Sequence, residues 1–182
     1  MNATASKSAA PASGITRLIA GVMVATVLVA LALAASPFDL ASALRVHPRL
    51  KLPEFALIAR QSWILKLHLG AALSALAIGL VIMARPKGVG LHKTLGWLWV
   101  GAMAVTAVSS FFLRGLNGGA LSLIHLLSGW TVIVLPMGVA AIRSRNVVTH
   151  RRIMTNLYVG GLLIAGALTF IPGRLMWAVF FG

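Results

Sequence analysis

The stretch LSLIHLLSGWTVIVLPMGVAAI runs from residue 121 to residue 142 without a charged side chain. An α-helix rises about 1.5 Å per residue, so a helix of this length crosses the roughly 30 Å hydrocarbon core of a lipid bilayer. The stretch therefore predicts a membrane-spanning helix.

Other apolar stretches of the chain have the same character. They predict further spans at about residues 19–35, 67–84, 95–113 and 153–171. The chain is 59% hydrophobic and 10% charged, with a mean hydropathy of +0.96. One water-soluble core of 182 residues cannot bury that much apolar surface. We therefore predict an all-α integral membrane protein, an antiparallel helical bundle of five transmembrane helices with a four-helix core and an N-terminal anchor.

The segments outside the spans predict the domain organisation. Residues 1–14, rich in alanine and serine, predict a disordered leader, and residues 15–182 a single membrane domain. The first span has the basic flank of a signal peptide, but its apolar run is longer than a usual signal core, which favours a retained anchor. Residues 36–61, broken by prolines, predict short amphipathic turns with His47 as a solvated loop residue. The tail 175–181 is too short to cross and is expected at the interface or folded back.

The loop charges predict orientation. Basic residues crowd the loops 85–93 and 143–152, which the positive-inside rule places in the cytoplasm together with the N-terminus. We therefore predict a multi-pass membrane protein in contact with membrane lipids. The net charge of +14 does not predict a nucleic-acid partner, because the basic residues lie in loops or near span ends.

Two absences narrow the chemistry. The only acidic residues, Asp39 and Glu54, lie between the first two spans, so no carboxylate lies inside the membrane. This disfavours ion-coupled transporters and proton pumps. The chain has no cysteine, which excludes disulfides, cysteine-ligated clusters, covalent c-type haem and a thiolate nucleophile. Histidine and methionine are the side-chain iron ligands that remain.

The tryptophans give a prediction about depth. Trp63, Trp97, Trp99 and Trp177 lie near span ends, which is typical of an aromatic belt at the membrane surface. Trp130 lies deeper in its span, so we expect it to pack against other helices.

Four histidines stand near the start of four successive spans: His68, His92, His125 and His150. Successive spans run in opposite directions, so His68 and His125 share one face of the membrane and His92 and His150 the other. A pair of bis-histidine haems needs this arrangement. Four interfacial histidines without a cofactor would produce the same pattern.

The outer pair lies in the more apolar surroundings. An unsatisfied imidazole in hydrocarbon costs several kcal/mol, so His125 needs a partner, for which Ser122, Ser128 or a haem iron would serve. His68 is shallower. If the second and fourth spans are neighbours, His68 and His125 could ligate one haem from opposite sides.

The inner pair has basic neighbours. Lys93 follows His92, and Arg151 and Arg152 follow His150. These cations suit the propionates of a second haem, an anionic substrate such as ascorbate, or lipid phosphates. Thr149 is a candidate cap for the fifth span.

From about His68 to the C-terminus, the chain resembles a family of bacterial membrane proteins catalogued only as a domain of unknown function. The resemblance covers about 110 residues and implies no activity. It rests on the following motifs: Lys66-Leu-His-Leu-Gly70, His92-Lys-Thr-Leu-Gly-Trp97, Ser122-Leu-Ile-His-Leu-Leu-Ser128, Thr149-His-Arg-Arg-Ile-Met154, Gly160-Gly-Leu-Leu-Ile-Ala-Gly166 and Ile171-Pro-Gly-Arg-Leu-Met176.

The histidine pattern also resembles the cytochrome b561 family, in which histidines on four consecutive helices bind two b haems that pass electrons across the membrane. The resemblance implies that His68 pairs with His125 and His92 with His150. This resemblance rests only on the similar pattern of histidines.

Three functions follow as hypotheses. The first is a membrane electron-transfer protein of the b-type cytochrome kind, with one or two haem b groups and a quinol or small-molecule donor. The alternative is a non-enzymatic accessory or scaffold protein without cofactor, in a larger complex or a homo-oligomer. A transporter ranks last, because hydroxyls on helices usually bond to their own backbone. Its polar track would run through Ser74, Thr106, Ser109, Ser110 and Thr131.

Overall fold

The computed structural model describes residues 49–88, 90–113 and 123–181. The predicted leader, the first predicted span at 19–35, His47 and Ser122 lie outside the described residues. Within the described part of the chain all regular secondary structure is helical, as predicted.

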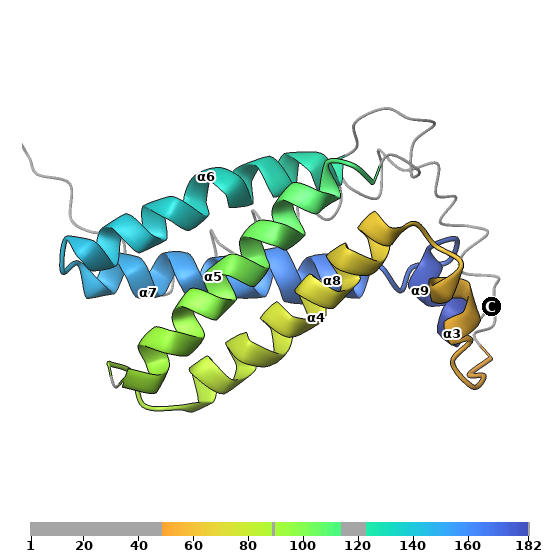
Figure 1. Cartoon of the computed structure of the whole chain (residues 1–182), viewed down its shortest axis with the longest axis horizontal. Helices are drawn as coiled ribbons and strands as arrows, with labels where there is room; N and C mark the ends of the chain where they lie inside the picture. The colour runs from red at the N-terminus through yellow and green to blue at the C-terminus, as the bar shows by residue number, and fades with distance from the viewer. Residues whose placement is uncertain (1–48, 89, 114–122, 182) are drawn as a thin grey trace, which may run out of the picture.

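Four long helical stretches correspond to the four later predicted spans (Figure 1). They are α4 (Trp63–Ala84), α5 (Gly90–Ser110), α6 (Leu123–Arg143) and the succession of α7 (Val147–Asn156), η1 (Leu157–Ile164) and α8 (Ala165–Leu168). By length and composition, α4 and α6 are able to cross a membrane.

Local sequence explains where these helices begin and end. The Ser62 side chain accepts a hydrogen bond from the Leu65 amide at 3.3 Å and caps α4. α4 ends at Ala84 and the following residue, Arg85, is extended, because Pro86 disfavours helical geometry in the residue before it. Asn146 caps α7 by accepting from the Thr149 amide at 3.0 Å. The cap is thus Asn146, and the prediction of Thr149 was wrong.

The helices pack as two hairpins that cross obliquely in Figure 1. α4 lies along α5, and α6 lies along α7. α5 also packs on α6, while η1 packs on both α4 and α6. We call the end where α4 begins and α5 ends the His68 end, and the end where α4 ends and α5 begins the His92 end.

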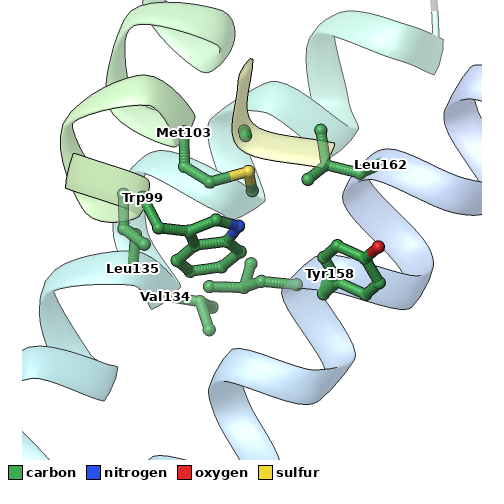
Figure 2. Close-up of a cluster of buried hydrophobic side chains, with 8 residues drawn as sticks. Trp99, Met103, Val134, Leu135, Tyr158 and Leu162 are labelled. Atoms are coloured by element: carbon green, nitrogen blue, oxygen red, sulfur yellow. The ribbon is translucent and has the colours of Figure 1, made fainter. Parts of the chain in front are cut away.

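Large aromatic side chains fill the centre between the hairpins. Trp99 and Met103 of α5 face Tyr158 and Leu162 of η1 (Figure 2). α4 makes room for them with a small residue: a Cβ on Gly79 would lie within 3.0 Å of both the Tyr158 ring and Trp99 Nε1. The close approach of α4 therefore depends on glycine at position 79.

Outside the centre, the long helices expose apolar side chains. Such a continuous surface is unusual for a water-soluble monomer and typical of lipid contact. It includes Leu73, Leu80, Leu98, Val108, Leu126, Ile133 and Met137.

The burial of two tryptophans differs from the prediction. Trp99, expected in a surface belt, is 4% exposed and belongs to the core. Trp130, expected to pack, is 62% exposed on a stripe with Leu126 and Ile133. Position along a helix sets depth in the membrane, but only the neighbouring helices decide which side faces inward.

The fourth helical stretch contains a π-helix that the sequence did not predict. η1 has the wider i→i+5 turn over eight residues. It carries the adjacent glycines Gly160 and Gly161, whose α-helix propensity is low. Within η1, the Tyr158 hydroxyl donates to the Leu76 carbonyl of α4 at 3.2 Å.

Replacing Tyr158 with phenylalanine removes that hydrogen bond and keeps the ring. We expect the free energy of unfolding to fall by about 1 kcal/mol, the usual net value of such a bond. Unfolding of the detergent-solubilised protein, followed by circular dichroism, measures it. Tyr158→Leu also removes ring packing and should cost more; equal losses for both variants would contradict this account.

The ends of the described chain meet beside the long helices. The short helix α3 (Phe55–Ala59) contacts α9 (Leu175–Phe180), the apolar tail. The amides of Lys51 and Glu54 donate to the carbonyls of Phe180 and Val179, each at 3.1 Å. The tail thus folds back, one of the two placements expected for it.

Candidate functional site

A buried polar cluster lies at the His68 end of the molecule. Its members come from three helices, and Ser109, Ser110, His125 and Ser128 are all buried among otherwise apolar residues. We call this set, together with His68 and Thr106, the serine–histidine cluster. It contains the two histidines that the sequence predicts as the outer pair.

His68 reaches across from α4 to the last turn of α5. Its Nδ1 lies 3.0 Å from the Thr106 carbonyl oxygen and 3.0 Å from Ser109 Oγ. A carbonyl oxygen can only accept, so Nδ1 carries the proton and donates it. The Ser109 hydroxyl donates in turn to the same carbonyl at 3.1 Å. In the neutral imidazole, Nε2 therefore keeps its lone pair.

His125 stands on the other flank of that turn. It is 5% exposed, and its ring centroid lies 6.2 Å from that of Phe111. One turn further along α6, the Ser128 hydroxyl is hydrogen-bonded with that of Ser110, which also donates to the Ala107 carbonyl at 2.7 Å. The serines Ser109 and Ser110 thus connect the α4 and α6 sides of the cluster.

The helices that carry these two histidines are not direct neighbours in the main packing. The haem prediction assumed contact between them, whereas α4 and α6 each pack on α5 and η1. They therefore lie diagonally within the described helices, with α5 and η1 each in contact with both.

The hydroxyls of the predicted polar track bond within their own helices. Ser74 donates to Gly70 and Thr106 to Ala102, each at 2.8 Å. Thr131 donates to the Leu127 carbonyl at 2.9 Å. This confirms the expected back-bonding, and these hydroxyls need no polar ligand to satisfy them.

His150 lies between α7 and α6, near the far end of the molecule. Its Nδ1 is 2.9 Å from the Gly138 carbonyl, so it too carries the proton and donates. A Cβ on Gly138 would come within 3.0 Å of Ile153 and Met154, so glycine permits this approach. The His150 ring is thus partly buried against a neighbouring helix.

His92 lies at the start of α5, before the predicted span that begins at Leu95. Burial, together with the positive charges of His150 and Lys87, lowers the pKa of His92. It lines a pocket of about 210 Å³ at the His92 end, whose other lining residues are Ile82, Arg85, Pro86, Leu91 and Leu95. His92 therefore lies in a strongly basic region.

The cluster chemistry limits the kinds of metal site. Among the described residues, no three histidine, aspartate or glutamate side chains come together. Three-ligand sites of the catalytic zinc type are thus not formed by this part of the chain. This observation does not bear on haem, because a haem iron takes only two protein ligands.

Comparison with known proteins yields one match. The model of a family described as "Predicted membrane protein (DUF2306)" matches residues 65–181, which include His68, His92, His125 and His150. No curated protein matches. No solved structure matches. The predicted resemblance to an uncharacterised membrane family is confirmed, whereas the pattern resemblance to cytochrome b561 gains no support.

Proposed function

The chain belongs to the DUF2306 family of predicted membrane proteins, and we propose that it binds haem b between its helices and transfers electrons. In this proposal α4, α5, α6 and the α7–α8 stretch all cross a bacterial inner membrane. The stretch 19–35 adds an N-terminal anchor as the fifth span. The N-terminus faces the cytoplasm.

The hydrogen bond from His68 Nδ1 to the Thr106 carbonyl carries the proposal. A metal-ligating histidine nearly always donates its second ring N–H to a carbonyl or carboxylate, which fixes its tautomer and ring orientation. In His68 this bond holds the proton on Nδ1 and leaves Nε2 able to bind iron. The Ser109 hydroxyl supports the same orientation at 3.0 Å.

His125 is the proposed second ligand. It lies at the same end of the molecule on the diagonal helix and is almost fully buried beside Phe111. Bound haem supplies a reversible one-electron change. The chain's own contribution is to hold the imidazoles, exclude water, and tune the potential through the Nδ1–H bond and the apolar surroundings.

A glycine near His125 favours a flat ligand. Gly129 lies about one turn after His125 on the same face of α6, and a Cβ there would meet only Phe111 Cζ at 3.9 Å. This position is thus open to a macrocycle.

Binding of a second haem by His92 and His150 stays a prediction within this proposal. His150 Nδ1 donates to the Gly138 carbonyl in the same manner as His68 to Thr106. A second haem would need His92 as its partner. The proposed electron donor is a quinol or another small molecule.

A scaffold role is the competing proposal, and the core packing favours it. Trp99, Met103 and Tyr158 fill the centre of the helices with side chains. Helices packed in this way do not need a cofactor to hold them together. The buried serine hydroxyls already form hydrogen bonds within the protein. In that case the protein would act through a larger complex or as a homo-oligomer.

An absorption spectrum of the full-length protein, purified in detergent from cells supplied with haem precursor, separates the two. We expect a Soret band and sharp b-type α and β bands on reduction by dithionite. A folded, monodisperse and colourless protein that takes up no added hemin would exclude the haem proposal and leave the scaffold role.

A further inference from the structure

We propose that the pocket at the His92 end, between the end of α4 and the start of α5, holds the phosphate head group of an acidic phospholipid. This inference does not depend on haem binding. It assigns a ligand class to a site formed by Arg85 and His92, and the haem at the His68 end uses neither residue.

The lining of the pocket matches an anion joined to an apolar chain. Its polar groups are Arg85 and His92, and the rest of the wall is apolar, from Ile82, Leu91 and Leu95. A volume of about 210 Å³ suits a head group rather than a large soluble cofactor, since ligand pockets usually measure about 300–1,000 Å³.

The charge around the pocket has no counter-ion within the described protein. Glu54 is the one acidic residue among the described residues, and it pairs with Lys51 at 3.2 Å beside α9. Lys87 lies next to the pocket, with Nζ donating to the Met83 carbonyl at 2.9 Å. The negative charge that balances Arg85 and Lys87 must therefore come from outside the described residues.

Arginine and histidine are well suited to a phosphodiester. The planar guanidinium donates two parallel hydrogen bonds to phosphate oxygens, and an imidazole N–H adds a third donor. The pocket opens beside exposed apolar residues of both helices, Met83 and Leu91. The acyl chains of a lipid can contact this apolar surface while its phosphate stays at the helix ends. A free phosphate has no acyl chains to make these apolar contacts.

Native mass spectrometry of the full-length protein in detergent tests the assignment. The protein is titrated with dioleoyl phosphatidylglycerol and, separately, with dioleoyl phosphatidylcholine. We expect one phosphatidylglycerol to bind more tightly than any phosphatidylcholine. Arg85→Gln should weaken that first site about tenfold, which equals about 1.4 kcal/mol and is typical of hydrogen bonds to a charged group.

Arg143→Gln is the matched control, because it removes one guanidinium from the end of α6, outside the pocket lining. It should change the first binding constant by less than about twofold, as expected for a diffuse surface charge. His92→Leu, which removes a single hydrogen-bond donor, should weaken the site less than Arg85→Gln does.

Three outcomes would overturn the proposal. Equal binding of the two lipids would show that the pocket does not distinguish an anionic head group from a zwitterionic one. Equal losses in Arg85→Gln and Arg143→Gln would assign binding to general surface charge. Displacement of the lipid by inorganic phosphate at equal concentration would assign the pocket to a soluble anion. The haem spectrum takes no part in any of these results.

Discussion

Replacing His125 with alanine is expected to abolish the haem spectrum of the His68 end. The proposed iron would lose a ligand, and α6 would lose its only histidine among the described residues. The pyridine hemochrome assay should show the haem content falling by about one per chain, and His68→Ala should give the same loss.

Loss of a fold and loss of a ligand must be distinguished. Each variant is therefore compared with the natural chain for elution volume and helical circular dichroism. Imidazole added to the His125→Ala protein should restore a low-spin spectrum by occupying the vacated space. His92→Ala is the matched control and should keep the His68-end haem. A His125→Ala protein that keeps its full spectrum would refute the proposed ligand.

Substituting alanine for Gly79 is expected to destabilise the protein strongly for so small a change. The new methyl group would lie within 3.0 Å of the Tyr158 ring and of Trp99 Nε1, so α4 must move away from η1. Overpacking of this kind costs about 1–3 kcal/mol. The better helix propensity of alanine offsets this by at most about 1 kcal/mol. The net effect is a lower unfolding midpoint in detergent.

The opposite sign is expected at Gly101, which supplies the control on α5. A Cβ there would meet nothing within 4 Å, so only the propensity gain remains. Gly101→Ala should leave the midpoint unchanged or raise it. If Gly79→Ala and Gly101→Ala shifted the midpoint equally, the close packing of α4 against Tyr158 would not hold.

Hydropathy predicted the helices well because it reports a local property. The predicted spans at 67–84 and 121–142 correspond to α4 and α6, and the tail after Pro172 folds back as allowed. Helix length and apolar content follow from consecutive residues and need no partner. The five-span topology and the anchor remain predictions.

Contacts between helices account for what the sequence left open. Trp99 was predicted to lie in a membrane belt. Its spacing of four residues from Met103, which puts both side chains on one face of α5, was the signal for a place in the core. The π-helix of η1 has a weaker signal, the Gly160–Gly161 pair. Neither pattern identifies the partner across the interface, so the Tyr158 bond to Leu76 could not be predicted.

The histidines illustrate the same division. Their place at successive span starts brings His68 and His125 to one end of the described structure, as the alternation predicted. Which ring nitrogen carries the proton could not be predicted from their positions in the sequence. Nδ1 of His68 and of His150 donates to a carbonyl on another helix, and those acceptors lie 38 and 12 residues away in the chain.

The sequence by itself determined that this chain forms apolar helices and that its histidines gather at their ends, because both follow from the order of residues along one helix. Only the tertiary structure decided which faces of those helices meet. That choice depends on contacts such as Gly79 with Tyr158 and Gly138 with His150. A missing side chain lets two helices approach closely. That approach determines which residues contact each other and, at His150, which ring nitrogen carries the proton.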